Sequence, residues 1–348
     1  MMRRLVGKTA LVTGGTDGIG KEIARGLAGQ GANVLLVGRD SDKGARARGD
    51  LCESTRNPHV EFLQADLSLI KEADRLAREI SRRWLSLDYL VHSAGVVRGR
   101  RELTIEGVES NFAINYLGRF ALTARLLPLL EAAGQPDHSA RIVIIGGAAL
   151  NGTIHFEDVN LTSNFRTLRA VGQFCQANDV FTVELGRRLA AADGSPHVTI
   201  TSLKVGVVKT NIRREFPWWM RLLVPLLDPF LAQTPVEAAR SALKLLLAED
   251  LEGSSGALFL KIRKFRRIEP GANTLDPGMG ALLWSLSDRL VRRALDRRNQ
   301  EGEKHHGNNQ HATCLEHPNV GWENPGNTHI ARISGQRNFK DCSRAPGN

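Results

Sequence analysis

Apolar runs of strand length alternate with amphipathic stretches of helix length from residue 8 to about residue 262. TALVTGG, NVLLVGR and RIVIIGG are apolar runs, and KEADRLAREISRRW is an amphipathic stretch whose apolar residues recur with a helical period. This alternation is typical of parallel strands joined by helices that cover both faces of a sheet. The pattern therefore predicts the α/β class and a single domain with a doubly wound parallel sheet.

The C-terminal part of the chain predicts two further helices and then a polar tail. Thr234, Pro235 and Glu237 form a helix start, with an N-cap, a proline at the first position and a capping-box glutamate. Residues 276–298 predict a final amphipathic helix, so the domain is expected to span residues 1–298. Residues 299–348 have no periodicity and are rich in Asn, Gly and His, which predicts a disordered polar tail.

Composition narrows the classes of function. The net charge is +10, but the arginines are spread along the helices and the tail without interleaved aromatic residues, so nucleic acid is not an expected partner. The four cysteines lie far apart, without disulfide or zinc-ligand spacing, so we expect no metal and a cytoplasmic location. The apolar segment 218–231 is interrupted by charged residues and prolines, and no membrane span is expected.

A glycine-rich turn, TGGTDGIG at 13–20, stands directly between the first predicted strand and a helix. Gly14 lets the chain turn, Gly18 allows the backbone to approach a pyrophosphate, and Gly20 lets the helix pack on the strand. The first turn of that helix presents free N–H groups to an anion. The turn therefore predicts a dinucleotide cofactor.

Five motifs in order give the chain a resemblance to the short-chain dehydrogenase/reductase family over about residues 5–262, and most to its retinol-dehydrogenase-type branch. They are TGGTDGIG, Asp66–Leu67 after the third strand, HSAG at 92–95, Asn115 in FAINYLGRF, and VGVVKT at 205–210. The resemblance implies a Rossmann fold and an oxidoreductase that uses a nicotinamide cofactor. It implies cofactor contacts from Gly14, Thr16, Asp17, Gly18, Ile19 and Gly20 at the phosphate turn, Asp66 with Leu67 at the adenine, Ser93, Ala94 and Gly95 at the adenosine ribose, and Val208 and Thr210 at the nicotinamide carboxamide.

Arg39 bears on the choice between the two nicotinamide cofactors. The second strand ends at Gly38, where an NAD-binding member of the family would usually carry an aspartate, and Arg39 follows at once. A guanidinium there can pair with a 2′-phosphate, which a carboxylate would repel, so NADPH is expected and NADH is the alternative. In that alternative, Asp40 is a displaced ribose ligand, or Arg39 only covers the surface.

The acid that the family uses is missing from this sequence. Family members carry Tyr-x-x-x-Lys on one helix, a serine at the preceding strand end and an asparagine between them. Anchoring on the flanking segments places Val171 at the Tyr position, Cys175 at the Lys position and Gly147 at the Ser position. No shift of register restores the pair, because neither of the two tyrosines is followed by a lysine four residues later. Asn115 alone remains, either as a catalytic residue or as one that merely shapes its helix.

Four side chains are candidate replacement donors: Cys175, Ser93, Lys204 and His155. A structural or cofactor-binding role is favoured for each of them. A different source of the proton is the substrate, because a phenol has a pKa of about 10, as tyrosine does. A ketone hydrogen-bonded to its own neighbouring phenol, as in polycyclic aromatic polyketides, carries the acid that the protein lacks.

Residues 212–232 fall where the family has its substrate-covering lid, and they are strongly apolar. Trp218, Trp219 and Phe230 in this segment would suit a polycyclic ring system. The alternatives are packing against the core and, given the arginines nearby, contact with a membrane surface.

The sequence therefore predicts an NADPH-dependent ketoreductase that acts on a polycyclic aromatic polyketide, as in angucyclinone-type antibiotic biosynthesis, with the proton supplied by the substrate. The alternative function is a catalytically inactive NADP(H)-binding sensor or scaffold, because three catalytic positions are lost. Family members commonly pair through the helix before Gly134 and the helix of residues 168–192, so a homo-oligomer is one further expectation.

Overall fold

The computed structural model describes residues 5–135, 138–148, 152–190, 197–206, 208, 233–251 and 254–305. In this part of the chain, eight strands form one sheet in the order β3-β2-β1-β4-β5-β6-β7-β8. The strands are β1 (Thr9–Thr13), β2 (Asn33–Gly38), β3 (Val60–Gln64), β4 (Tyr89–His92), β5 (Ala140–Gly147), β6 (Val198–Val205), β7 (Ala257–Lys261) and β8 (Phe265–Ile268). The first seven pair in parallel, and β8 adds an antiparallel edge that the sequence pattern did not predict.

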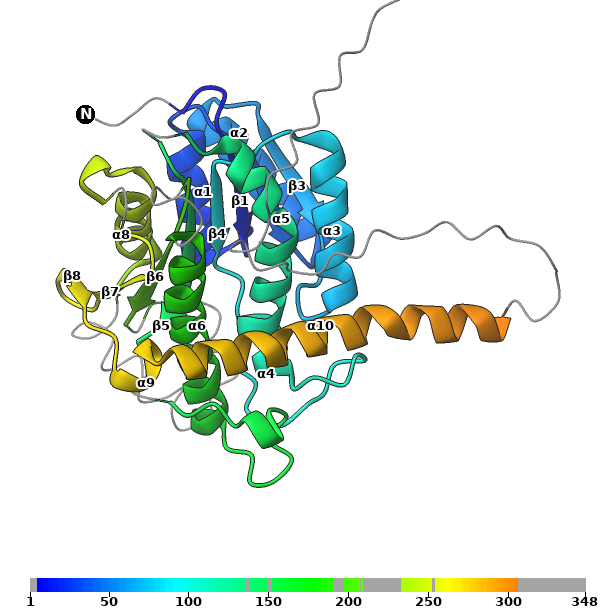
Figure 1. Ribbon diagram of the computed structural model, residues 1–348. Helices are drawn as coiled ribbons and strands as arrows, with labels where there is room; N and C mark the ends of the chain where they lie inside the picture. The colour runs from blue at the N-terminus through cyan, green and yellow to red at the C-terminus, as the bar shows by residue number, and fades with distance from the viewer. Residues whose placement is uncertain are drawn as a thin grey trace, which may run out of the picture. The chain divides into compact units, whose positions relative to one another are not determined.

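Helices cover both faces of this sheet (Figure 1). One face carries α1 (Gly18–Ala28), α2 (Ser41–Thr55) and α8 (Pro235–Leu247), and the other carries α3 (Ile70–Arg83), α5 (Gly118–Ala133) and α6 (Thr167–Ala190). Shorter elements are α4 (Ser110–Phe112), the π-helix η1 (Ala113–Leu117), α9 (Ala272–Leu275) and the 3₁₀ turns η2 (Phe156–Asp158) and η4 (Glu249–Leu251). The predicted doubly wound α/β fold is confirmed.

The strand order reverses between β1 and β4, which are neighbours in the sheet but not in the chain. The helices that follow these two strands lie on opposite faces, and the carboxyl ends of strands at such a reversal are where doubly wound folds bind ligands. Side chains alternate between the two faces along each strand. Leu203 and Val205 of β6 belong to the core cluster that packs under α1 and α8, so the residue between them faces α6.

The C-terminal helices α8 and α10 (Pro277–His305) were both expected from the sequence. The capping box at Thr234 is present, with the Thr234 side chain accepting from the Glu237 backbone N–H and the Glu237 carboxylate accepting from Thr234. The last helix, α10, spans Pro277–His305 and so continues through residues 299–305, which the sequence analysis assigned to the disordered tail. The helix therefore extends past the expected boundary at residue 298, and the disordered tail stays a prediction. Residues 306–348 lie outside the described part of the chain.

The helix α10 packs against α6 and α3, and its Trp284 also contacts Phe120 of α5 (Figure 1). The indole of Trp284 packs against the rings of Phe120 and Phe181, with centroids 5.1 and 6.2 Å away. The Arg188 guanidinium lies over the same indole, 3.9 Å from its centroid. This is the face through which the family resemblance implied that copies pair. A homo-oligomer stays a prediction, and pairing through this face would require α10 to move.

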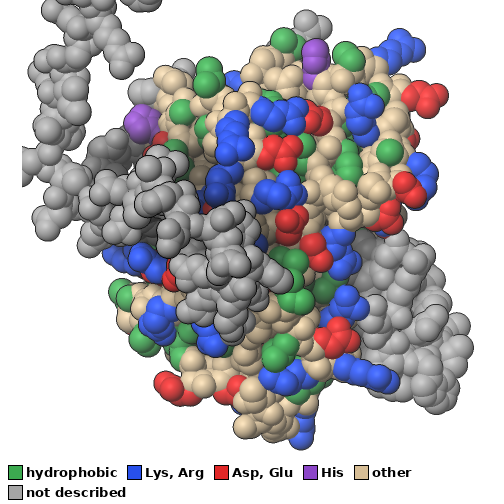
Figure 2. Space-filling view, turned by 90° about the vertical axis from the view of Figure 1, so that its right-hand side faces the viewer, with side chains coloured by type: hydrophobic (Ala, Val, Ile, Leu, Met, Phe, Trp, Pro, Cys, Tyr) green, Lys and Arg blue, Asp and Glu red, His purple; other side chains and the backbone are tan. Residues whose placement is uncertain are grey.

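Charged side chains of both signs are interspersed over the described part of the face shown in Figure 2. On α3, Arg75 pairs with Glu72 and Glu79, and Arg83 pairs with Glu61 of β3. These pairs are exposed to solvent and contribute little to stability. Within the described residues, no helix combines the length and apolar character needed to cross a membrane.

We expect Trp284→Ala to lower the free energy of unfolding by about 3–5 kcal/mol, because it removes a buried aromatic side chain and leaves a cavity under α10. Leu282→Ala on the same helix is the matched control. Its side chain is 57% exposed, so the change should stay within about 0.5 kcal/mol. Urea denaturation followed by circular dichroism measures both, and equal effects of the two substitutions would contradict the packing described.

Candidate active site

The glycine-rich turn connects β1 to α1 at the carboxyl ends of the central strands. Gly14 and Gly18 have φ values of +66° and +52°, which side chains rarely tolerate. A Cβ on Gly14 would lie 2.8 Å from backbone atoms of Ala94, and one on Gly20 would lie 2.4 Å from the Gly14 carbonyl oxygen. The Asp17 side chain caps α1 by accepting from Gly18 N at 2.7 Å. The turn is therefore a tight cradle at a helix N-terminus, and its shape fits a pyrophosphate.

The end of β4 is held against this turn by a threonine. Thr13 Oγ1 accepts hydrogen bonds from Ser93 N at 3.1 Å and Ala94 N at 3.2 Å. A Cβ on Gly20 would also come within 3.2 Å of Ser93 Oγ. The structure therefore brings the predicted phosphate turn and the segment Ser93–Gly95 together at one edge of the sheet.

A second cation, which the sequence analysis did not select, joins Arg39 at the end of β2. The Arg39 side chain is exposed, and its carbonyl accepts from Gln64. Asp40 is the N-cap of α2 and accepts from Lys43 N at 2.9 Å, a role that competes with ribose binding. Lys43 Nζ lies 2.6 Å from Asp17 Oδ2, which places it beside the glycine turn. The signal for it in the sequence was a lysine in the first turn of the helix that follows Arg39.

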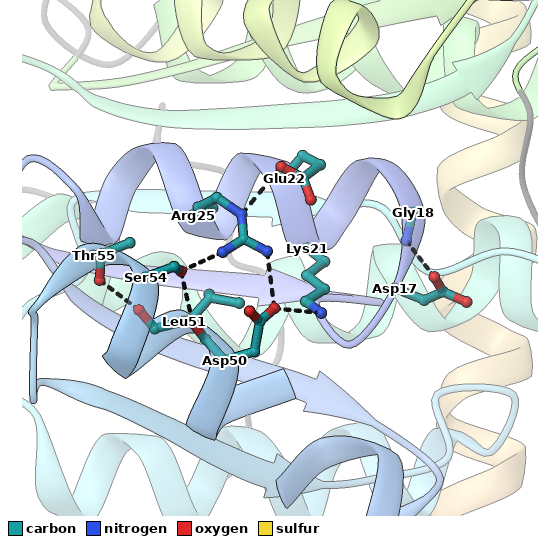
Figure 3. Close-up of polar contacts among 9 residues, drawn as sticks. All are labelled: Asp17, Gly18, Lys21, Glu22, Arg25, Asp50, Leu51, Ser54 and Thr55. Carbon is teal, nitrogen blue, oxygen red and sulfur yellow. Dashed lines mark hydrogen bonds and ion pairs between the residues drawn. The ribbon is translucent and has the colours of Figure 1, made fainter. Parts of the chain in front are cut away.

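A network of charges fixes α2 against α1 (Figure 3). Asp50 of α2 accepts from Lys21 at 2.6 Å and from Arg25 at 2.9 Å, and Arg25 also reaches Glu22 on its own helix. The hydrogen bonds from Lys21 and Arg25 lower the pKa of Asp50 to about 2, so its carboxylate is ionised at neutral pH. The network therefore holds the second half of α2 against α1, and the Lys43–Asp17 pair holds its start next to the glycine turn.

The remaining predicted cofactor residues are partly within the described chain. Asp66 follows β3, where its carboxylate accepts from the backbone and hydroxyl of Ser68 at 3.0 and 2.7 Å, and Leu67 beside it is buried. Val208 forms a bridge with Gln233. Thr210 and the proposed lid, 212–232 with Trp218, Trp219 and Phe230, lie outside the described residues. The adenine, ribose and carboxamide contacts stay predictions.

The three positions that should carry the family's Ser, Tyr and Lys lie on β5 and α6. Gly147 is the last residue of β5, and Cys175 lies on α6 one turn after the half-buried Val171. The Cys175 thiol donates to the Gly147 carbonyl oxygen, with a separation of 3.8 Å. Burial, together with the charge of Asp179, raises the pKa of Cys175 to about 11, so it is a neutral thiol at physiological pH.

Asn115 lies in the π-helix η1, where its side chain braces the loop after β4. Its Nδ2 donates to Val96 O at 2.7 Å and Asn111 O at 2.8 Å, and its Oδ1 accepts from Val96 N at 3.2 Å. Its own carbonyl accepts from Asn178 of α6 at 2.9 Å. These contacts agree with the role of shaping the helix, and a catalytic role for its side chain stays a prediction.

Arg119 is buried beneath the site, and sequence reasoning missed it. Its Nη2 donates to Ala94 O at 2.8 Å, and its Nη1 donates to Ile145 O at 3.0 Å. Burial lowers the pKa of Arg119 to about 10, which still leaves it charged at neutral pH. The signal was an arginine in the otherwise apolar start of a helix, FAINYLGRFALT.

The other candidate donors have partners. The imidazole of His155 contacts the Arg169 guanidinium at 2.9 Å, and burial and this cation lower the pKa of His155. Lys204, the penultimate residue of β6, forms an ion pair with Asp179 of α6, a partner that sequence reasoning did not find. Among the described residues, no group of three or more His, Cys, Asp or Glu side chains is placed to hold a metal ion.

Comparison with known proteins identifies the family. The short chain dehydrogenase model matches residues 8–158. The polyprenol dehydrogenase of Homo sapiens is 33% identical over 281 residues, which cover 80% of this chain and 84% of the relative. Retinol dehydrogenase 13 of Mus musculus is 35% identical over 291 residues, which cover 82% and 84% of the two chains.

Solved structures agree with this result. An uncharacterised protein from Mycobacterium paratuberculosis has a TM-score of 0.65 and 28% identity, covering 84% of this chain and 96% of that one. The active-site complex of Pseudomonas aeruginosa RhlG with NADP has a TM-score of 0.59 and 25% identity, covering 74% and 95%. The chain belongs to the short-chain dehydrogenase family, whose members are NAD(P)-dependent oxidoreductases acting on alcohols or carbonyls.

We expect Gly20→Ala to weaken dinucleotide binding at least about tenfold, a change of about 1.4 kcal/mol, because the added Cβ would force the turn open. Gly49→Ala is the control, since a Cβ there meets no atom within 4 Å. Titration of NADPH fluorescence measures the affinity, with circular dichroism to verify that both variants fold. Unchanged affinity of the Gly20 variant would show that the cofactor does not use this turn.

Proposed function

We propose that the protein is an NADPH-dependent ketoreductase that reduces a carbonyl of a polycyclic aromatic polyketide, of the angucyclinone type, and that the substrate supplies the proton. One observation carries the proposal. The cofactor cradle is intact, whereas the positions of the usual acid carry Gly147, Val171 and a neutral, buried Cys175.

Residues that follow β1 and β2 would hold the phosphates of the cofactor. Gly14, Gly18 and Gly20 fit the pyrophosphate, and Arg39 is free to meet a 2′-phosphate. The ion pair of Lys43 with Asp17 removes the repulsion that a lone aspartate would exert on that phosphate. The NADP of the RhlG complex supports the same cofactor for this chain. When bound, the nicotinamide supplies the hydride.

We expect Arg39→Ala to weaken NADPH binding about tenfold, with little change for NADH, because a charge-assisted hydrogen bond to the 2′-phosphate is lost. Arg82→Ala is the control, because it removes the same charge from the last turn of α3, at the amino ends of the strands and away from the glycine turn. It should leave both affinities unchanged. Calorimetric titration of both cofactors measures the ratio. An equal loss for NADPH and NADH would favour the role of Arg39 as a surface residue.

The proton is the remaining chemical requirement. Hydride arriving at a carbonyl carbon leaves an alkoxide, and the oxygen must gain a proton in or directly after that step. The Cys175 thiol, with a pKa of about 11 and a hydrogen bond to Gly147, is a weak and already engaged donor. A phenol beside the ketone has a pKa of about 10 and is held within reach by the substrate's own ring, which gives it a high effective concentration.

The apolar residues of the segment 212–232 support a large, flat substrate. The segment 212–232 holds Trp218, Trp219 and Phe230, whose rings suit aromatic stacking. The names of the relatives, retinol and polyprenol dehydrogenases, also refer to large apolar alcohols. Such a substrate would exclude water from the carbonyl, as a proximity mechanism requires.

The test uses NADPH deuterated at nicotinamide C4 with aromatic polyketide ketones, with and without a free hydroxyl next to the carbonyl, and with retinal for comparison. We expect deuterium in the alcohol formed from the hydroxy-ketones, and at least about a hundredfold slower reaction when that hydroxyl is methylated, because a positioned acid contributes about this much. Equal turnover of the methyl ethers would exclude the substrate acid. Tight NADPH binding without transfer to any carbonyl would identify a sensor or scaffold.

A further inference from the structure

Lys204 lies on the α6 side of the sheet, at the carboxyl edge where the site is. Its neighbours Leu203 and Val205 pack in the core under α1 and α8, so Lys204 points to the opposite face. In the register of β5 and β6 it is paired with Gly146. The lysine therefore stands beside the strand end at which the family's serine is missing.

The ammonium of Lys204 is held in an ion pair with Asp179 that is largely removed from solvent. The two side chains are 14% and 9% exposed. An ammonium has three N–H donors, and Asp179 is the only hydrogen-bond partner of Lys204 Nζ within the described part of the chain. Burying such a pair usually brings little net stability, so its place at the site calls for another explanation.

Within the described part of the chain, the two glycines that end β5 leave room beside this pair. A Cβ built on Gly146 would have no atom of the described residues within 4 Å, and one on Gly147 would meet only the Cys175 sulfur, at 3.9 Å. The charged groups that act on this sulfur are Asp179, Lys204 and Arg119. Arg119 donates to two backbone carbonyls, and its remaining nitrogen, Nε, is fully buried, whereas the partly exposed Lys204 keeps donors for a further partner.

We propose that Lys204 is a catalytic residue whose ammonium donates a hydrogen bond to the phenol oxygen of the substrate, which becomes negative when the phenol gives up its proton. Asp179 positions the Lys204 ammonium. The inference rests on the proposed function. The carbonyl carbon gains the hydride, the electron pair of the C=O bond moves to its oxygen, and that oxygen takes the proton of the neighbouring phenol. The phenolate left behind lies against Lys204 and regains a proton from water as the product leaves.

A catalytic Lys204 differs from a lysine that only stabilises the fold in one measurable property, the pKa of a bound phenol. A cation that contacts the phenol oxygen lowers the pKa of that phenol, whereas an ion pair that only joins β6 to α6 does not. This effect can be measured without cofactor and without turnover. It therefore separates the role of Lys204 from the question of whether the protein is a reductase.

The probe is 1-hydroxyanthraquinone, a flat ketone with a neighbouring phenol whose ionisation changes its visible absorbance. We expect its pKa when bound to the wild-type protein to lie at least about one unit below that in Lys204→Met, which is a tenfold change in the ionisation constant. Lys204→Arg should restore most of the shift. With hydroxy-ketone substrates and NADPH, Lys204→Met should also lower kcat about tenfold or more.

Two further variants control for structure. Lys8→Met breaks another partly buried pair, with Asp88 at 2.8 Å, at the amino end of β1, and should change neither the phenol pKa nor kcat. The double variant Lys204→Met with Asp179→Asn leaves no buried unpaired carboxylate, so it should fold even if the single variant does not, and should show the same raised phenol pKa.

An equal phenol pKa in the wild type, the double variant and Lys8→Met would overturn the proposal, as would failure of the wild type to bind the probe. If the phenol shift depends on Lys204 but no ketone accepts deuterium, the proposed reduction fails while the oxyanion site at Lys204 stands. If ketones are reduced and the phenol pKa is indifferent to Lys204, the reductase stands and the role of Lys204 is wrong.

Discussion

The guanidinium of Arg119 joins the parts of the molecule that any chemistry here must use. It donates to Ala94 O at the end of β4 and to Ile145 O near the end of β5, and it lies 3.4 Å from the Asn178 amide oxygen of α6. The strand ends of a parallel sheet leave backbone carbonyls without a ladder partner, and a buried charge without a carboxylate partner needs such acceptors. The two Nη atoms of Arg119 and these carbonyls satisfy one another, and they tie the ends of β4 and β5 together, although the buried Nε has no hydrogen-bond partner in the described part of the chain.

The site has two halves, one on the β1 side of Arg119 and one on the β6 side. Toward β1, the Thr13 hydroxyl holds the β4 end against a glycine turn shaped for a dinucleotide, with cations at the start of α2. Toward β6, the strand end carries glycines, a neutral thiol and the Lys204–Asp179 pair. The first half has the shape of a dinucleotide cradle, and the second carries a positive charge but neither Tyr nor Ser at the family's catalytic positions. This asymmetry is the physical reason for assigning the proton to the substrate.

The fold and the tight glycine turn could be predicted from the sequence, because both depend on local patterns: apolar runs of strand length and glycines where a Cβ cannot fit. The absence of a Tyr-x-x-x-Lys pair is read directly from the sequence, whereas its consequence for the acid stays a prediction. The contacts of Arg119 and the partner of Lys204 could not be predicted, because backbone acceptors leave no trace in sequence and Asp179 is 25 residues away. The packing of Trp284 on Phe120 likewise depends on tertiary structure, although the helix that carries it was foreseen.

The central claim is that the substrate's phenol is the acid. Its most direct test is the single-turnover rate of hydride transfer to a series of hydroxy-ketones whose substituents change the phenol pKa. Each rate is divided by the rate at which borohydride reduces the matching methyl ether, which corrects for the effect of the substituent on the carbonyl itself. The account predicts that the corrected rate rises as the phenol pKa falls, with a fractional Brønsted slope. A corrected rate that is independent of the phenol pKa would contradict it.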